Sequence, residues 1–298
     1  MLVRVAARLG VPSGRLRLLP ARGFGHDHVL VGEGEAVVRV PRQGDGARLA
    51  FLAAGFSRGS ASGHVPRPLM LLPPGPDLPC GALLVEAVAG RPPRLPADMP
   101  AIARALAAIH RLPLPAETGP IPLTGDPVAA ILAVARPVLA GHAVAGLAEE
   151  LAWAAGFKAA PFSPCLVFGD VHPGNFRIRA DGEAVFLDVE KHSYSHPAID
   201  LAHASLPSST GFDPDLACRL TRQEVIAFHR AYGPLPPDIL PFRRLVFLRT
   251  TAFAAAMRQA PGEGSFAAHV ADWAAGLLRP EAIAATRAEW LGPTALPL

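Results

Sequence analysis

The fold is decided by the stretch Leu166-Val-Phe-Gly-Asp-Val-His-Pro-Gly-Asn-Phe176, which is followed by Ala184-Val-Phe-Leu-Asp-Val-Glu190. Both runs begin as apolar strands and end in polar residues. The first ends in Gly-Asp and a tight Pro-Gly turn that presents Asn175, and the second delivers Asp188. Polar groups in such places are supported by rigid neighbours and stay open to a ligand. Asp170, Asn175 and Asp188 are therefore candidate functional residues.

These three residues have the chemistry and the order that phosphoryl transfer requires. One carboxylate must orient the attacking hydroxyl, and hard oxygen ligands must hold Mg²⁺ against the phosphates. In kinases the catalytic Asp stands five residues before a metal-binding Asn, and a second metal-binding Asp follows. Asp170 and Asn175 have this spacing, and Asp188 ends the next strand. Each residue alone is also typical of a turn or a helix cap, so the hypothesis depends on the ordered set.

The rest of the chain predicts two unequal lobes. Short β-like runs are expected at 29–31, 36–41, 69–72 and 82–88, with one helix-like piece at 47–56. From Pro96 onward apolar residues recur at helical spacing. Helices are expected at 101–112, 126–140, 146–158, 214–232, 236–259, 264–278 and 280–290. We predict an α+β protein with a small β-rich N-terminal lobe, residues 1–88, and a larger helical C-terminal lobe, residues 89–298.

Composition excludes several classes of protein. No apolar run reaches the roughly 20 residues of a membrane span, and the first eight residues include two arginines, which a secretory leader would not place there. The net charge is +3 and basic residues are scattered, so we expect no nucleic-acid partner. Three distant cysteines without a CxxC pair indicate a reducing compartment. We predict a cytoplasmic protein without a membrane partner, either a monomer or a homodimer.

In these motifs the sequence resembles the aminoglycoside phosphotransferase and choline kinase family, relatives of protein kinases in fold. The likeness rests on Phe168-Gly-Asp-Val-His-Pro-Gly-Asn175, Leu187-Asp-Val-Glu190 and His196-Pro-Ala-Ile-Asp-Leu-Ala202. Weaker support comes from Val38-Arg-Val-Pro41, Leu83-Leu-Val-Glu86 with Gly90, and Leu106-Ala-Ala-Ile-His110. The pieces follow the family order across about residues 20–205. The resemblance implies a bilobal, protein-kinase-like fold, with nucleotide bound by the N-terminal lobe and the acceptor by the C-terminal lobe.

The resemblance also implies roles for the residues of the catalytic segment. Asp170 would be the base that faces the acceptor hydroxyl, and Asn175 and Asp188 would bind magnesium. His172 would shape the loop rather than transfer a proton. Glu190 would orient the loop or a second metal shell. The last of the supporting residues is Asp200, which would anchor the loop through hydrogen bonds.

For the nucleotide, the resemblance implies a glycine turn and a connector. Gly23 and Gly25 would form the turn over the phosphates, where backbone N–H groups can approach. The connector would be the segment from Val85 through Glu86 to Val88, whose backbone would bind adenine. Other nucleotide folds fit less well, because a P-loop needs a lysine and none precedes Lys158.

The phosphate-binding half departs from the kinase pattern in two ways. Arg39 stands where kinases have a lysine that contacts the phosphates. Arginine keeps the charge and binds phosphate in a bidentate manner, so the geometry changes. The next helix should offer a glutamate to this cation, but 47–54 contains no acid. The partner is therefore absent or supplied from elsewhere, and the choice between ATP and GTP stays open.

We predict an ATP- and Mg²⁺-dependent enzyme that moves the γ-phosphate to a hydroxyl of a small molecule. The acceptor is an aminoglycoside-type antibiotic or a metabolite such as an amino alcohol or a sugar. A polycationic acceptor needs acidic walls. The helices after residue 205 hold scattered acids, among them Asp213, Asp215, Glu224, Asp238, Glu263 and Asp272, with as many arginines nearby. The alternative is a non-catalytic nucleotide-binding regulatory protein on the same fold, motivated by the missing lysine and glutamate.

Overall fold

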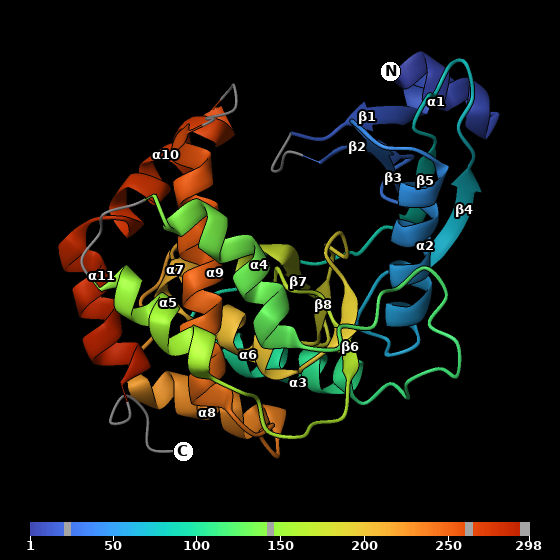
Figure 1. Ribbon diagram of the computed structural model, residues 1–298. Helices are drawn as coiled ribbons and strands as arrows, with labels where there is room; N and C mark the ends of the chain where they lie inside the picture. The colour runs from blue at the N-terminus through green and yellow to red at the C-terminus, as the bar shows by residue number, and fades with distance from the viewer. Residues whose placement is uncertain (21–24, 142–145, 260–264, 293–298) are drawn as a thin grey trace.

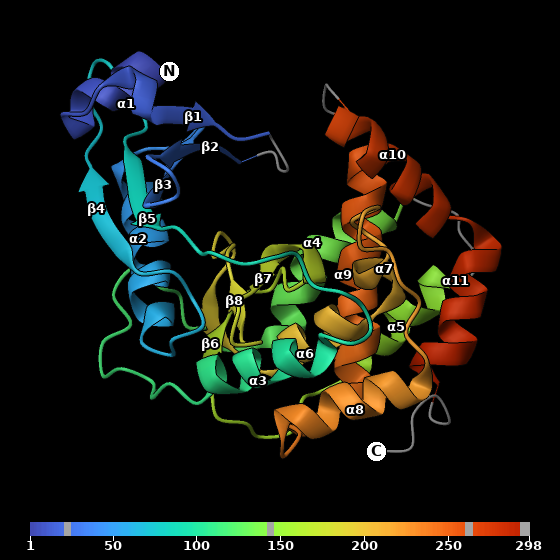
Figure 2. The same ribbon diagram turned by 180° about the vertical axis from the view of Figure 1, so that it is seen from behind.

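The computed structural model describes residues 1–20, 25–141, 146–259 and 265–292. A small lobe built around a β-sheet lies beside a larger helical lobe (Figure 1). Seen from behind, the molecule shows α3 and α8 along the bottom of the helical lobe (Figure 2). The fold is thus the bilobal α+β architecture that the sequence predicts.

The small lobe contains a five-stranded antiparallel sheet in the order β1-β2-β3-β5-β4. Its strands are β1 (Leu16–Leu18), β2 (His26–Val31), β3 (Ala36–Pro41), β4 (Pro68–Leu72) and β5 (Ala82–Glu86). Helix α1 (Leu2–Leu9) and the 3-10 turn η1 (Ser13–Arg15) precede the sheet, and α2 (Gly46–Ser60) follows β3. Helix α2 begins where the Asp45 side chain accepts the N–H groups of Ala47 and Arg48, an N-cap that satisfies two free donors.

Strand β3 shows why one arginine of this lobe faces the functional region. Side chains alternate between the two faces of a strand. Val38 and Val40 belong to a hydrophobic cluster with Val5 of α1. Arg39 therefore lies on the opposite face, where its guanidinium carbon is 5.4 Å from the ring centre of Phe56 on α2.

The large lobe is mostly helical and holds two small antiparallel β pairs, β6 with β9 and β7 with β8. Its first elements are α3 (Met99–His110), α4 (Pro127–Leu139), α5 (Leu147–Gly156), β6 (Cys165–Val167), η2 (Pro173–Asn175), β7 (Phe176–Ile178), β8 (Ala184–Phe186) and β9 (Ser193–Ser195). The remaining ones are α6 (Ala198–Ser205), α7 (Pro207–Thr210), α8 (Arg222–Tyr232), α9 (Ile239–Gln259), α10 (Ser265–Leu277), α11 (Pro280–Thr286) and the π-helical turn η3 (Arg287–Leu291).

Helix α9 is the central element of the large lobe and contacts α4, α6 and α10. A helix with apolar residues on most of its faces is buried by its neighbours. Phe242, Leu245, Val246, Phe247 and Leu248 are all fully buried. No described helix has both the length and the apolar character needed to cross a membrane.

The two lobes share one hydrophobic core at their junction. Leu49, Leu52 and Phe56 of α2 belong to the same buried cluster as Phe168 and Phe186 of the large lobe. Burying several large apolar side chains contributes roughly 1.5–3 kcal/mol each. Helix α2, and with it the face of the sheet that carries Arg39, is therefore held against the large lobe.

The predicted elements are present, with differences at their ends. Strand 36–41 is found with its predicted bounds, whereas the run 82–88 ends at Glu86, because its pairing with β3 ends there with Ala36. The helix expected at 214–232 begins only at Arg222, because Thr221 and Glu224 form a capping box there. The sequence did not predict α1, β1, α7 or β9, all of which are eight residues or shorter.

Candidate active site

The loop after β6 is fixed by a buried carboxylate from α6. Asp200 is fully buried and accepts the backbone N–H groups of Phe168 at 2.8 Å and Gly169 at 2.7 Å. Its Oδ2 also lies 3.3 Å from Nε2 of His110 on α3. Gly169 has a φ of 71°, in the left-handed region that favours glycine. These contacts, which the sequence analysis assigned to Asp200 as an anchor, fix the backbone that presents Asp170.

Asn175 connects this loop to the segment that carries Asp188. Its side-chain nitrogen donates to the carbonyl of Asp170 at 2.9 Å, which leaves the amide oxygen to face a ligand. Its backbone carbonyl accepts the N–H of Leu187 at 2.8 Å. The short turn η2 therefore sets the spacing between the candidate base and the candidate metal ligands.

Asp188 follows β8 in the chain, and its side chain is 29% exposed. Its Oδ1 accepts the N–H of Glu190 at 3.1 Å and lies 3.5 Å from Nη2 of Arg39. Burial raises the pKa of Asp188, and although Arg39 opposes this effect, the charges of Glu190 and Asp170 add to it. A divalent cation would offset the repulsion between these negative charges. The Asp188 carboxylate and the Asn175 amide oxygen are hard oxygen donors of the kind that Mg²⁺ prefers.

Arg39 finds its acidic partner on this same segment. Its Nη2 donates to Oε1 of Glu190 at 3.0 Å, and its Nη1 donates to the carbonyl of Leu187 at 3.0 Å. His26 Nδ1 also contacts Oε1 of Glu190. Burial opposes ionisation of Glu190, but the hydrogen bonds and charges of His26 and Arg39 lower its pKa to about 2. The glutamate expected on the helix after β3 is thus replaced by Glu190, and α2 offers the ring of Phe56 instead.

The residues predicted to bind nucleotide are only partly brought together. Gly25 lies against Glu190, because a Cβ at this position would come within 2.5 Å of Oε2. Gly23 lies outside the described residues. Val85 is buried in β5 and pairs with Val37, so the expected connector is divided by the end of the strand. Glu86 is the last residue of β5 and pairs with Arg67, and Val88 lies in the segment that leads to α3.

His172 is partly buried in the loop that follows β6, where it lines the neighbouring pocket. Its ring centre lies 4.9 Å from that of Phe212. Burial lowers the pKa of His172, and the neighbouring Asp170 and Asp213 carboxylates oppose this effect. The neutral imidazole thus packs against Phe212 in a tilted arrangement, and its predicted role in shaping the loop stays a prediction.

Sequence reasoning missed three side chains around Asp170. Lys191 Nζ lies 2.5 Å from Oδ2 of Asp170, although the lysine side chain is 58% exposed. Arg249 of α9 donates from Nη2 to the carbonyl of Gly169 at 2.5 Å. His203 of α6 places Nε2 at 3.8 Å from Oδ1 of Asp170, and burial lowers the pKa of His203 to about 4. The signal for Lys191 was present, because it is one of only two lysines and directly follows Glu190.

These neighbours determine the ionisation of Asp170. Burial is the largest single effect and raises the pKa of this carboxyl. The charges of Lys191, His203 and His172, together with the hydrogen bond from Lys191, outweigh burial and hold the pKa well below its usual range. Asp170 is therefore a carboxylate at every physiological pH. An anion of this kind orients a hydroxyl strongly and is a weak base.

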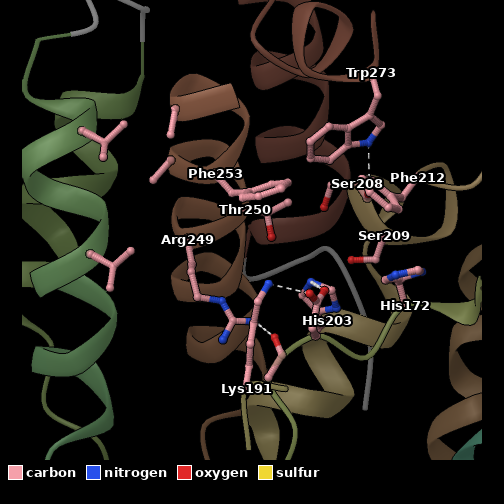
Figure 3. Close-up of a pocket in the computed structure, with 16 residues that line it drawn as sticks. His172, Lys191, His203, Ser208, Ser209, Phe212, Arg249, Thr250, Phe253 and Trp273 are labelled. Carbon is pink, nitrogen blue, oxygen red and sulfur yellow. Dashed lines mark hydrogen bonds and ion pairs between the residues drawn. The ribbon is translucent and has the colours of Figure 1, made fainter. Parts of the chain in front are cut away.

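Asp170 lies at the floor of a pocket of about 440 Å³ in the large lobe. Its walls come from α4, α7, α9 and α10 and from the loop after α7 (Figure 3). The lining residues are Val134, Val138, Gly169, Asp170, His172, Lys191, His203, Ser208, Ser209, Phe212, Arg249, Thr250, Ala252, Phe253, Ala256 and Trp273. Asp170 is the single acid among these described residues. Of the six acids singled out in the C-terminal third, Glu263 lies outside the described residues and the other five do not line the pocket.

Comparison with known proteins places this chain among phosphotransferases. A family model described as the phosphotransferase enzyme family matches residues 18–241. No curated protein sequence matches the chain. A choline/ethanolamine kinase family protein from Mesorhizobium loti has a similar structure, with a TM-score of 0.65 and 17% identity over 95% of this chain and 97% of that one.

Two further solved structures show the same fold. The aminoglycoside phosphotransferase APH(2")-IIIa, solved with GDP and kanamycin, has a TM-score of 0.65 and 17% identity over 96% of both chains. The macrolide 2'-phosphotransferase MphH from Brachybacterium faecium has a TM-score of 0.60 and 21% identity over 94% of this chain and 97% of that one. The kinase-like fold predicted from the catalytic segment is confirmed by these likenesses.

Proposed function

Because the chain belongs to the phosphotransferase enzyme family, we propose that it transfers the γ-phosphate of ATP to a hydroxyl of a small molecule. One observation carries the proposal: Asp170 lines a pocket, while Asn175 of the same loop is hydrogen-bonded both to Asp170 and to Leu187, the residue before Asp188. An acceptor in the pocket and a metal-bound phosphate would then meet at Asp170. Solved structures of the same fold contain GDP and ATP, which supports a nucleotide as the donor.

In the proposed reaction Asp170 orients the acceptor. The hydroxyl oxygen bonds to the γ-phosphorus as the bond from that phosphorus to the β–γ bridging oxygen breaks, and ADP leaves with that oxygen. The hydroxyl proton passes to the carboxylate of Asp170 and then to solvent. Because Asp170 is a weak base, it accepts this proton late, which suits the loose transition state of phosphoryl transfer.

Asn175 and Asp188 would hold magnesium, which when bound neutralises charge on the phosphates and positions them for in-line attack. Arg39 would contact the phosphates, with its guanidinium orientation fixed by Glu190 and by the carbonyl of Leu187. Lys191 Nζ, already at the carboxylate of Asp170, lies on an exposed and extended side chain. We propose that its ammonium group stabilises the transferred phosphoryl group, whose negative charge is spread over three oxygens.

The geometry weakens the case for the alternative function, a non-catalytic nucleotide-binding regulatory protein. That alternative rested on the missing lysine and the missing helix glutamate. Arg39 keeps the positive charge at the lysine position, and Glu190 supplies the acidic partner of that charge. A non-catalytic protein has no physical need for a carboxylate kept ionised beneath a ligand-sized pocket. Catalysis therefore remains the function that the geometry supports best.

Single-turnover transfer from γ-labelled ATP tests the proposal. Wild type and Asp170→Asn are mixed with Mg-ATP and a panel of alcohols, and the labelled products are separated. We expect transfer to fall about 10²- to 10⁴-fold in the variant while ATP binding is retained. Equal transfer by both proteins, or equal loss of ATP without acceptor, would show that Asp170 is not catalytic. Repeating the series with GTP decides the choice of nucleotide.

A further inference from the structure

The pocket above Asp170 has a wall of three aromatic rings. Phe212 and Trp273 meet edge to face, with ring centres 5.1 Å apart and an angle of 88°. Phe253 adds a third ring, 6.1 Å from Trp273. Trp273 Nε1 donates to the carbonyl of Ser208 at 3.1 Å, so the polar end of the indole is already satisfied. The rings therefore present apolar faces and edges to a ligand (Figure 3).

The charges around the pocket are unfavourable for an amine. Lys191 and Arg249 are its two cationic lining residues, and Asp170 is the single acid among the lining residues described. Lys191 already pairs with that acid at 2.5 Å. Arg249 binds a backbone carbonyl, so its charge has no carboxylate partner among its hydrogen bonds. The described lining thus carries a net positive charge, which repels cations and attracts anions.

Two hydroxyls supply the uncharged polar contacts that orient a ligand. Ser208 is 7% exposed and Ser209 is 3% exposed, and neither Oγ has a hydrogen-bond partner in the described structure. Figure 3 shows both hydroxyls turned toward the space enclosed by Phe253, His203 and His172. Buried polar groups without a partner cost free energy unless a ligand or water satisfies them. These serines are therefore sites for a neutral polar group, such as a carbonyl, ether or second hydroxyl.

From these three observations we propose that the acceptor is an uncharged or anionic alcohol with a largely apolar, ring-bearing body. Its rings would lie against Phe212, Phe253 and Trp273, and an anionic group would lie near Arg249. Polycationic amines are excluded from this pocket. The proposal rests on the proposed function for the identity of the reaction, whereas the charge preference of the pocket stands on the lining alone.

A matched panel of alcohols tests the charge preference. It contains 2-phenylethanol and its para-carboxylate and para-aminomethyl derivatives, with kanamycin as the polycation. Transfer from Mg-ATP is measured as kcat/KM, and binding is measured separately by calorimetry at low salt. We expect the neutral and carboxylate members to bind and react at least about tenfold better than the ammonium member. Kanamycin is expected to give no transfer.

An engineered charge sharpens the experiment. Val134 on α4 lines the pocket and is 59% exposed, so Val134→Glu adds a carboxylate to the wall without removing buried apolar contacts. We expect it to shift the ratio of ammonium to carboxylate affinity by about fivefold toward the cation. Val3→Glu is the matched control, because Val3 is 72% exposed on α1 in the other lobe, and it should leave activity and binding unchanged.

The outcomes separate the two proposals. Transfer confined to the amines would overturn the acceptor class and support the kinase reaction. Binding of the neutral and anionic members without transfer would contradict the kinase reaction and support the charge preference. If no member binds, or if Val134→Glu leaves the ratio unchanged, the pocket does not select its ligand as proposed.

Discussion

Glu190 Oε1 lies 3.0 Å from Nη2 of Arg39, although 151 positions separate the two residues in the chain. In protein kinases the corresponding cation is paired by a glutamate of the helix in the N-terminal lobe. Here the acid comes from the segment that also carries Asp188. Arg39, the proposed phosphate-binding cation, is therefore linked to Asp188, the proposed metal ligand, because Glu190 and Leu187 of the same segment both accept hydrogen bonds from Arg39.

Replacing Glu190 by glutamine should weaken both stability and nucleotide binding. The Arg39 side chain is only 7% exposed, and it would lose the nearer of its two carboxylate partners, keeping Asp188 at 3.5 Å. We expect the free energy of unfolding to fall by about 1–3 kcal/mol, with a higher KM for ATP. Urea denaturation and steady-state kinetics measure the two effects. Glu35→Gln is the control, because Glu35 pairs with Arg15 at the surface, where such pairs contribute about 0–1 kcal/mol. Equal effects at the two sites would contradict the assigned role.

Asp200→Asn should destabilise the catalytic loop. An amide offers one oxygen where the carboxylate accepts two backbone N–H groups, and its NH₂ would face one of those donors. We expect the free energy of unfolding to fall by about 2–3 kcal/mol and kcat to fall with it.

Asp126→Asn is the matched control for this change. Asp126 also accepts two backbone N–H groups, from Val128 and Ala129, but through one oxygen at the start of α4. Asparagine serves equally well as an N-cap, so little change is expected. A loss in Asp126→Asn as large as in Asp200→Asn would show that the effect is general to capping carboxylates.

Lys191→Met should lower kcat about 10- to 100-fold and leave the affinity for ATP nearly unchanged, because the ammonium acts on the transferred group. Lys158→Met is the natural control, since Lys158 is the other lysine of the chain and is exposed. Amine-directed acylation gives a second measurement. Modification of Lys191, located by mass spectrometry, should track the loss of activity, and Mg-ATP with acceptor should protect it. Full activity after complete acylation would exclude this role.

His196 should make the protein less stable in mild acid. Its ring is fully buried and stacks on Phe242 at 4.1 Å, and its Nδ1 accepts the N–H of Ala198 at the start of α6. Burial lowers the pKa of His196 to about 4, an effect that the Asp238 charge opposes. The unfolded chain, with a pKa near 6.5, binds more protons in this interval, so stability falls as the pH drops from about 6.5 to 4.

His196→Asn removes this titration and keeps an acceptor for Ala198. We expect the slope of unfolding free energy against pH to become flatter between pH 6.5 and 4, by at most roughly 3 kcal/mol over the interval. Denaturant titrations at several pH values measure the slope. An unchanged slope would place the acid sensitivity in other groups.

The candidate catalytic residues could be predicted because their relationship is local. Asp170, Asn175 and Asp188 lie within one short stretch of strands and a turn. Their separation along the chain therefore largely determines their separation in space. The partner of Arg39 could not be predicted in this way. Nothing in the sequence near β3 indicates that Glu190, 151 positions away, lies beneath it.

The acceptor pocket was beyond prediction for a different reason. Phe247 and Phe253 belong to the same helix, and both fit an apolar helical pattern. The first is fully buried in the core, whereas the second lines the pocket. Periodicity distinguishes apolar from polar faces, and it does not distinguish a core contact from a ligand contact. Only the packing of α4, α7 and α10 around α9 separates the two.

The pocket walls have a consequence for how this protein can change over evolutionary time. Most of the pocket lining comes from α4, α7, α9 and α10, helices that contribute neither Asn175, Asp188 nor Arg39. A mutation at an exposed position of the pocket wall, such as Val134, can thus change which molecules bind without altering the proposed catalytic and metal-binding residues. Related lineages can acquire new acceptors by single substitutions, without first passing through an inactive ancestor.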